Sequence, residues 1–264
     1  MNTQIQTENA SKFSREELRE AIMTEYKAVA CDPNHTIHFT SGRKLAKRLG
    51  YTEDIMSQIP ESAIRPFAGV GNPFHIDEPP KGSKILDIGS GCGFDSIYAS
   101  ILTHRSIMVT GVDMTEEMLE QARKNAIIAE CTNIQFVKGY AEDLPIPSES
   151  MDLVISNGVI NLCLDKEQVY KEIHRVLRPG GEFRIADVML DIPVPETSKE
   201  LIHLWTNCVA GAVTKTEYRE YIKNAGFIWM GFGMQYDVFH DAKIAKSAAY
   251  FGAKGQNILG IKKG

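Results

Sequence analysis

From Lys84 onward, short runs of β-branched and other apolar residues alternate with segments of helical periodicity. Helices are expected from Phe94, over 116–129 and over 166–177. The seven expected strands are 84–89, 107–113, 133–139, 152–158, 181–189, 227–239 and 256–263. Strands that alternate with helices predict an α/β fold with a doubly wound, mainly parallel seven-stranded sheet, whose ligands bind at the carboxyl ends of the strands.

The first 82 residues lack this alternation. Ser14 and Glu17 are spaced as a capping box ahead of a helix that runs to about Ala30. A short helix over 42–49 and a Pro- and Gly-rich linker or lid over 66–80 follow. We therefore expect two parts, an N-terminal helical cap over 1–82 and a ligand-binding domain over 83–264.

Near the end of the chain, the stretch 196–226 has a helical pattern that stops at Gly226. The last two expected strands follow it and are close enough in sequence to form a hairpin-like pair. The end of the sheet is therefore predicted to differ from its parallel centre.

The overall composition excludes several classes of protein. The chain has 264 residues and a formal net charge of −5, which argues against a nucleic-acid partner because such a partner needs a basic face. No apolar run reaches the roughly 18 residues of a membrane span, and the first residues lack the apolar core of a signal peptide. We expect a cytoplasmic protein with a small-molecule partner and no membrane partner; oligomeric state is left open.

Cysteine usage points away from disulfides and zinc. The five cysteines are scattered and odd in number, and none lies in a CxxC pair. A disulfide framework or a structural metal site is therefore not expected. We predict no bound metal.

The most informative segment is the glycine loop 87–93, DIGSGCG, between an expected strand and an expected helix. Its glycines allow a tight turn and close approach of backbone N–H groups to a ligand. Asp87 at the mouth of this loop would repel a pyrophosphate but suits a ligand that carries cations, such as the ammonium and sulfonium of S-adenosylmethionine. The predicted cofactor-binding residues of the loop are Asp87, Gly89, Ser90, Gly91 and Gly93.

Two further strand ends carry groups that suit the same cofactor. Asp113 ends the second strand, where a carboxylate can accept two hydrogen bonds from ribose hydroxyls, and Met114 beside it can lie on an adenine ring. After the third strand, Ala141 or Glu142 is expected at the edge of the adenine. Three strand ends with matching chemistry favour S-adenosylmethionine over a dinucleotide.

Taken together, the motifs DIGSGCG, GVDM, GYAEDLP, DLVISNGVINL and VLRPGG resemble those of class I S-adenosylmethionine-dependent methyltransferases, over roughly residues 60–230. The resemblance implies a Rossmann-like fold, with an antiparallel last strand. It also implies that Asp87 lies near the methionine moiety, that Asp113 holds the ribose, and that Asn157 lies next to the transferred methyl. With the sulfonium otherwise open to water, residues 1–80 are expected to cover the carboxyl ends of the strands.

A narrower resemblance concerns the methyl acceptor. The segments GVGNPF (69–74), SNGVINL (156–162) and LWTNCVAGAV (204–213) resemble arsenite methyltransferases, which hold As(III) through cysteine thiolates. The resemblance implies that Cys208 is one ligand and that Cys31 is a candidate N-terminal partner. Gly158 stands where a third cysteine is expected, and Cys163 lies five residues later as a candidate substitute.

Other acceptors remain open at this point. His35, His38 and Tyr26 are acid–base candidates for an organic acceptor, and four aromatic residues are candidate pocket walls: Phe67, Phe74, Tyr140 and Trp205. The alternatives are a methyltransferase of an organic metabolite, with a C, N, O or S acceptor, and a non-catalytic protein that binds an adenosine ligand. An NAD-dependent dehydrogenase is disfavoured by Asp87 and by Phe94, which replaces the third glycine of a dinucleotide fingerprint.

Overall fold

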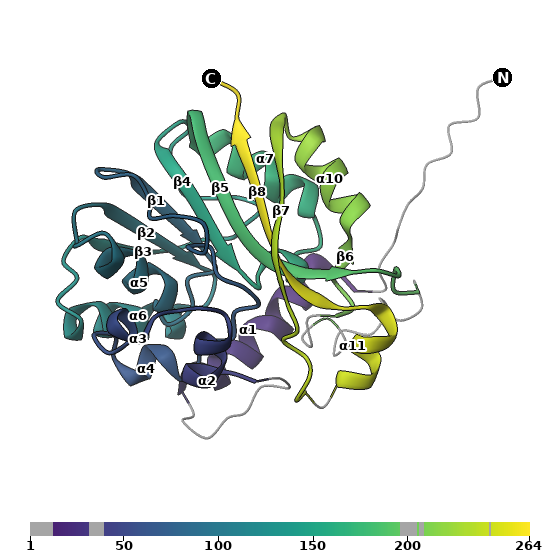
Figure 1. The fold of residues 1–264 in the computed structure, drawn as a ribbon, viewed down its shortest axis with the longest axis horizontal. Coiled ribbons are helices and arrows are strands. Elements are labelled where there is room, and N and C mark those ends of the chain that lie inside the picture. The colour runs from purple at the N-terminus through teal and green to yellow at the C-terminus, as the bar shows by residue number, and fades with distance from the viewer. Residues whose placement is uncertain (1–12, 32–39, 196–204, 206–208, 243) are drawn as a thin grey trace.

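The computed structural model describes residues 13–31, 40–195, 205, 209–242 and 244–264. Its centre is an eight-stranded sheet in the order β3-β2-β1-β4-β5-β8-β7, with the short strand β6 paired to β5 off this path (Figure 1). The strands are β1 (Lys84–Ile88), β2 (Met108–Asp113), β3 (Ile134–Lys138), β4 (Met151–Asn157), β5 (Leu177–Leu190), β6 (Val213–Thr214), β7 (Phe227–Tyr236) and β8 (Lys254–Lys262). The predicted α/β fold is confirmed, and β6 is the strand that the sequence did not indicate.

Strand direction is uniform from β3 to β5 and then reverses at β8 and again at β7. The five strands from β3 to β5 are parallel to one another, whereas β8 is antiparallel to both β5 and β7. The expected antiparallel pair at the end of the chain is thus present, with β8 inserted between β5 and β7. Since the reversal occurs beyond β5, the carboxyl ends of β1, β2, β3 and β4 all meet at one edge.

Helices cover both faces of this sheet. The bounds of the helices are α1 (Arg15–Cys31), α2 (Gly42–Arg48), α3 (Glu53–Met56), α4 (Glu61–Ile64), α5 (Phe94–Leu102), α6 (Glu116–Ile128), α7 (Lys166–Val176), α10 (Lys215–Asn224) and α11 (Ala245–Phe251). Leu86 and Ile88 of β1 pack in the hydrophobic core that includes α7 and α10, while Ile85 packs in the core that includes α5 and α6. Burial on both faces explains why the strands read as continuous apolar runs.

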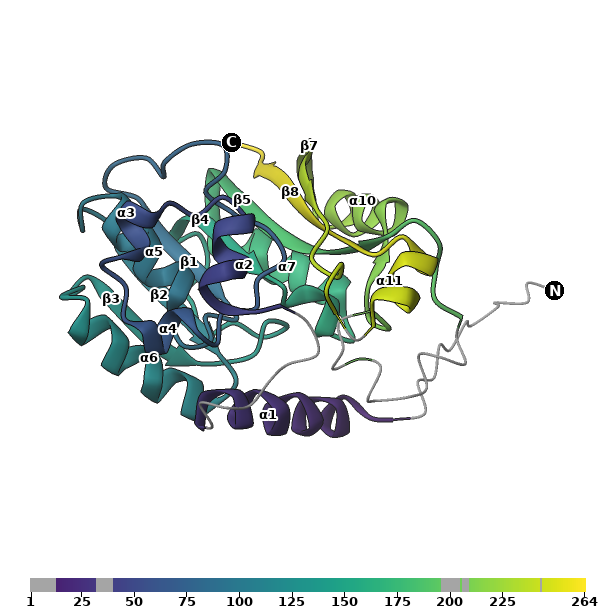
Figure 2. The same cartoon turned by 60° about the horizontal axis from the view of Figure 1, so that its bottom comes forward.

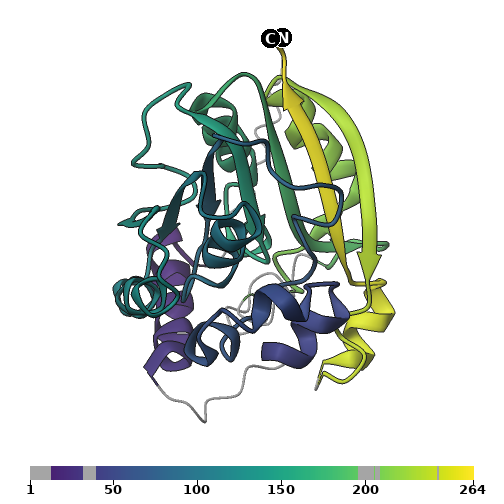
Figure 3. The ribbon, with the colours of Figure 1, turned by 60° about the vertical axis from the view of Figure 1, so that its left-hand side comes forward.

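The N-terminal helices lie at the carboxyl ends of the parallel strands, as Figure 3 shows. In Figure 2, α1 runs across this edge beside α6. The predicted capping box is present, since the Ser14 backbone N–H donates to Glu17 (2.7 Å) and the Glu17 N–H donates to Ser14 Oγ (3.1 Å). The hydrophobic core of α5 and α6 also contains Leu18, Ile22 and Phe67, so one core joins the N-terminal helices to the sheet.

The helical pattern predicted over 196–226 is confirmed at α10 but is wrong at Val213 and Thr214. Val213 and Thr214 form β6, which pairs with Met189 and Leu190 of β5. Thr214 then caps α10, since its Oγ1 accepts the Glu217 N–H and the Glu217 side chain accepts the Thr214 N–H. This capping box starts a new helix at Lys215, which the apolar periodicity of the sequence could not separate from the preceding residues.

Candidate functional site

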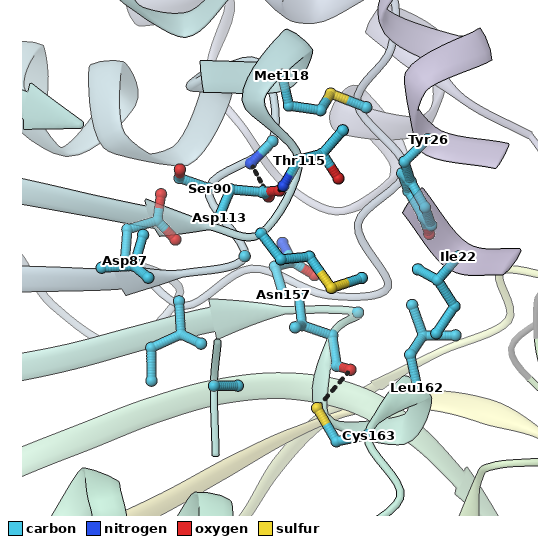
Figure 4. Close-up of a pocket in the computed structure, with 18 of the residues that line it drawn as sticks. Ile22, Tyr26, Asp87, Ser90, Asp113, Thr115, Met118, Asn157, Leu162 and Cys163 are labelled. Atoms are coloured by element: carbon cyan, nitrogen blue, oxygen red, sulfur yellow. Dashed lines mark hydrogen bonds between the residues drawn. The ribbon is translucent and has the colours of Figure 1, made fainter. Parts of the chain in front are cut away.

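A cavity opens at the edge where the parallel strands end (Figure 4). The glycine loop after β1, the residues that follow β2 and β3, and the end of β4 form its floor. Residues of α1 and the segment 66–69 form the opposite side. The local fold therefore brings all the predicted cofactor motifs to one place.

The glycine loop adopts backbone conformations that suit glycine. The φ angles of Gly89, Gly91 and Gly93 are 73°, 52° and 89°, in the region that residues with a Cβ rarely adopt. A Cβ on Gly89 would overlap the Val159 side chain, whereas a Cβ on Gly91 would meet no atom within 4 Å. Gly91 lines the cavity, so its missing side chain leaves room for a ligand against the backbone.

Gly93 has a different role from the other two loop glycines. It lies outside the cavity lining and starts α5, and a Cβ there would come within 3.1 Å of Phe136 and 3.2 Å of Ala122. We therefore assign Gly93 to the turn and to helix packing. Ser90 lines the cavity and its hydroxyl is buried without a hydrogen-bond partner.

Asp113 at the end of β2 is hydrogen-bonded to the glycine loop. Its Oδ2 accepts the Gly91 N–H (2.9 Å) and its Oδ1 accepts the Thr115 N–H (2.8 Å). Burial raises the pKa of Asp113, and these two N–H donors act against that rise. Each carboxylate oxygen retains a lone pair for a further donor. Met114 and Ala141 also line the cavity, which fits their predicted places beside an adenine.

Two buried carboxylates lie together at the β1 end of the cavity. Asp87 is 2% exposed and accepts the Ser96 hydroxyl (2.6 Å). Asp95, in the first turn of α5, is 7% exposed and accepts the Tyr51 hydroxyl (2.5 Å). Burial raises the pKa of both, and the charge of Asp95 raises the pKa of Asp87 further. This end of the cavity is therefore suited to a cationic group.

Asn157 at the end of β4 lines the cavity, and its side-chain amide forms hydrogen bonds to other groups of the protein. Its Oδ1 accepts the Val70 N–H (2.7 Å). Its Nδ2 donates to Asp95 Oδ2 (3.1 Å) and to the Gly71 carbonyl (3.0 Å). Asn157 thus ties β4 to the segment 69–71 and to the carboxylate pair, so it positions these groups around the cavity.

The α1 helix is held over the cavity by ion pairs along its length. Arg19 pairs with Glu142 (3.1 Å), and its guanidinium lies 4.0 Å from the centre of the Tyr140 ring. Nearer the start of the helix, Arg15 pairs with Asp165 (3.3 Å), and nearer its end Lys27 pairs with Glu117. The carboxylate of Glu142, predicted at the adenine edge, is therefore occupied by a cation from α1.

The predicted acceptor residues do not converge within the described residues. Cys163 lines the cavity beside the end of β4, and its thiol lies 3.7 Å from the Val159 carbonyl as a donor. Burial raises the pKa of this thiol above its usual value, so it is protonated. Cys31 is exposed at the end of α1 and lies outside the cavity lining. Cys208, His35 and His38 lie outside the described residues.

Gly158, where the narrower resemblance expects a cysteine, also lines the cavity. A Cβ there would lie 3.7 and 3.9 Å from the two Val70 methyl groups and 3.5 Å from the Ala68 carbonyl. These are ordinary contact distances. A side chain at this position would therefore contact Val70 and the Ala68 carbonyl.

A buried polar cluster supports the turn that carries Cys163. Asp187 in β5 is fully buried, and its Oδ2 accepts the Asn161 N–H (2.8 Å). The Lys166 ammonium donates to the Cys163 carbonyl (2.6 Å) and lies 5.2 Å from the centre of the Trp205 ring. Burial raises the pKa of Asp187 to about 6. These contacts fix the β4–α7 connection from behind.

Sequence reasoning missed several residues of the cavity. Asp95, Arg15 and Arg19 line it, and Tyr51 contacts it through Asp95. A signal for Asp95 was available, because it stands eight residues after Asp87 at the start of the expected helix. Among the aromatic candidates, Phe67, Tyr140 and Tyr26 line the cavity, whereas Phe74 and Trp205 are buried elsewhere.

No described helix combines the length and apolarity that a bilayer crossing requires. Within the described residues, no three His, Cys, Asp or Glu side chains group closely enough to hold a metal ion.

Comparisons with known proteins agree with this geometry. Residues 79–226 match the family model described as "Methyltransferase domain". An arsenite methyltransferase of Halobacterium salinarum is 38% identical over 182 residues, which cover 69% of this chain and 46% of that protein. A 27-O-demethylrifamycin SV methyltransferase of Amycolatopsis mediterranei is 32% identical over 149 residues, 55% of this chain and 54% of that protein. The chain thus spans about half the length of these curated relatives.

A solved structure matches over more of the chain. The arsenic(III) S-adenosylmethionine methyltransferase of Chlamydomonas reinhardtii superposes with a TM-score of 0.61 at 30% identity, covering 83% of this chain and 73% of that structure. The similarity therefore extends beyond the glycine loop to most of the fold.

Proposed function

Because this chain belongs to the family of S-adenosylmethionine-dependent methyltransferases, we propose that it methylates a small molecule held between α1 and the end of β4. The main support for the proposal is that the glycine loop, Asp113 and the acidic end of the cavity, formed by Asp87 and Asp95, all line one cavity. When bound, S-adenosylmethionine supplies an electrophilic methyl group on a cationic sulfur. The acidic end suits the cations of that cofactor, and the open space at Gly91 suits its close approach to the backbone.

The residues of the chain would then have distinct tasks. Asp113 would hold the ribose hydroxyls, while Met114 and Ala141 would contact the adenine. Asn157 would hold the segment 69–71 against the reacting end, and the apolar residues of α1, among them Leu18 and Ile22, would exclude water. Methyl transfer is an in-line displacement, so orientation and exclusion of water account for most of what the protein must supply.

Arsenite is the first acceptor to test, because it is the acceptor in the names of the most similar relatives described above. In this chain Cys163 and Cys208 are the proposed arsenic ligands, and a thiol in solution would complete the coordination. Soft As(III) prefers sulfur, and its binding would displace the proton that burial keeps on Cys163.

An organic acceptor is the second candidate, and a specific observation favours it. Gly158 stands where the arsenite enzymes are expected to carry a thiol, and Leu162 and Leu164 give the cavity an apolar face nearby. A face of this kind suits a hydrophobic organic molecule better than a thiophilic ion.

The decisive experiment is incubation of the protein with methyl-labelled S-adenosylmethionine and a panel of acceptors, with arsenite plus glutathione included. If arsenite is methylated, Cys208→Ser and Cys163→Ser should each abolish that product and leave cofactor binding intact. If arsenite is not methylated but an organic acceptor is, the arsenite assignment fails and the methyltransferase assignment stands. Failure to bind S-adenosylmethionine by calorimetry would refute the whole proposal.

A further inference from the structure

The pair Asp87 and Asp95 is an unusual feature of the cavity. The two carboxyl groups come from adjacent elements, β1 and α5, and both line the cavity although both are almost fully buried. Ser96, the neighbour of Asp95, donates its hydroxyl to Asp87, which keeps the two acids close together.

The described residues supply hydrogen bonds to this pair but no ion-pair partner. The groups that face it are Tyr51 before α3, Ser96 of α5, Asn157 of β4 and a third acid, Asp113 of β2. No Lys, Arg or His of the described residues forms an ion pair with either acid. Ionising two buried carboxylates without a nearby cation costs a large free energy. In the ligand-free protein the pair therefore retains a proton.

Asp95 is placed nearer to the reacting end than Asp87. Its Oδ2 accepts a hydrogen bond from Asn157, the last residue of β4. The end of β4 is the position that the proposed function puts beside the transferred methyl. Asp87, by contrast, contacts Ser96 and lies on the β1 side. The two acids therefore suit two different cations of one ligand.

We propose that Asp95 and Asp87 form a two-carboxylate subsite in which Asp95 recognises the sulfonium charge, so that the protein binds the methyl donor more tightly than the demethylated product and releases a proton in doing so. This inference rests on the proposed function. Once the methyl group has gone to the acceptor, the sulfur keeps the electron pair of the broken bond and is neutral. The carboxylate pair then faces no sulfonium and takes up a proton, which weakens retention of the product.

Calorimetry with three ligands tests this without any turnover. S-adenosylmethionine and sinefungin carry a cation at or near the sulfur position, S-adenosylhomocysteine does not, and all three share the methionine ammonium. Titrations near pH 7 in two buffers of different ionisation enthalpy give the number of protons released. We expect the two cationic ligands to release more protons than S-adenosylhomocysteine and to bind about tenfold more tightly, as a charge-assisted contact would give. Equal proton release by all three would overturn the proposal.

Variants assign the effect to one acid. Asp95→Asn should remove the difference in proton release and bring the affinities for donor and product together, while S-adenosylhomocysteine still binds. Asp87→Asn should weaken all three ligands alike. Tyr51→Phe, which removes a hydrogen bond but leaves the Asp95 carboxyl, is the matched control and should keep the difference.

An Asp95→Asn protein that still discriminates would contradict the assignment to Asp95. If that variant does not fold, the three-ligand comparison in the unchanged protein still decides. If none of the three ligands binds, the proposed function itself fails, an outcome distinct from equal proton release.

Discussion

The two sides of the cavity are built in different ways. On the cofactor side, the glycine loop and Asp113 are joined through backbone N–H groups within 27 residues of sequence, 87–113. On the acceptor side, α1, the β4–α7 connection and the Trp205 ring meet through side chains that are far apart in sequence. A site built from backbone is set by local motifs, whereas one built from side-chain contacts can change its substrate without a change of fold.

The largest loss of stability is expected at Gly89, the cofactor-side position where an added Cβ would overlap a neighbouring side chain. Gly89→Ala should lower the free energy of unfolding by about 2–5 kcal/mol, since left-handed strain adds to the overlap with Val159. Gly91→Ala carries the strain alone, because no atom lies within 4 Å, and should cost about 1–2 kcal/mol. Urea unfolding without ligand measures both. Equal losses of stability in the two variants would mean that contact with the Val159 side chain is not what restricts Gly89.

A change of pH should alter the stability that both sides of the cavity contribute. Bound S-adenosylmethionine should remove the pH dependence that comes from the cofactor side. Asp87, Asp95 and Asp187 have folded-state pKa values raised by burial, so the stability they contribute is complete at low pH and is lost as pH rises through those values. For Asp187, a shift from 3.8 to about 6 corresponds to about 3 kcal/mol.

Thermal unfolding between pH 5 and pH 8 should therefore show lower stability at the higher pH. Saturating S-adenosylmethionine should remove the part due to the cofactor side and leave the part due to Asp187. Asp187→Asn should flatten what remains, whatever it does to absolute stability. A stability that rises over this range would show that the buried acids are ionised in the folded protein.

Removal of the Asp113 carboxylate should affect the cofactor side alone. Asp113→Ala should weaken S-adenosylmethionine binding by about 1–3 kcal/mol, the scale for charge-assisted hydrogen bonds. Calorimetric Kd values give the change, and Glu120→Ala on the exposed face of α6 is the control. An unchanged Kd for Asp113→Ala would remove this residue from the ribose site.

The smallest effect is expected at the contact that joins the two sides. Arg19→Met removes the ion pair with Glu142 and the contact with Tyr140, and should loosen α1 by about 1 kcal/mol. Hydrogen exchange of α1 should then be about fivefold faster, with exchange in the glycine loop unchanged. Lys27→Met, at a more exposed pair, should change less. Faster exchange throughout the protein would indicate a global rather than a local role for Arg19.

The sequence by itself determined the parallel α/β sheet, the glycine loop and the carboxylate at the end of β2. These features are local, since hydrophobic periodicity and glycine positions specify the elements, and the carboxyl ends of parallel strands must meet at one edge. The antiparallel final pair was also predictable, because β7 and β8 lie near each other in sequence. The strand β6 was not, since two residues carry no periodicity.

Only the tertiary structure decided which polar groups in the cavity are available to a ligand. Glu142 and Asn157 both line the cavity, but Arg19 pairs with the first and the segment 69–71 is hydrogen-bonded to the second. Asp95 was overlooked because a single acid at a helix start reads as an ordinary N-terminal charge. Its pairing with Asp87 depends on how α5 packs against β1, and side-chain contacts of that kind are fixed by packing over long sequence separations.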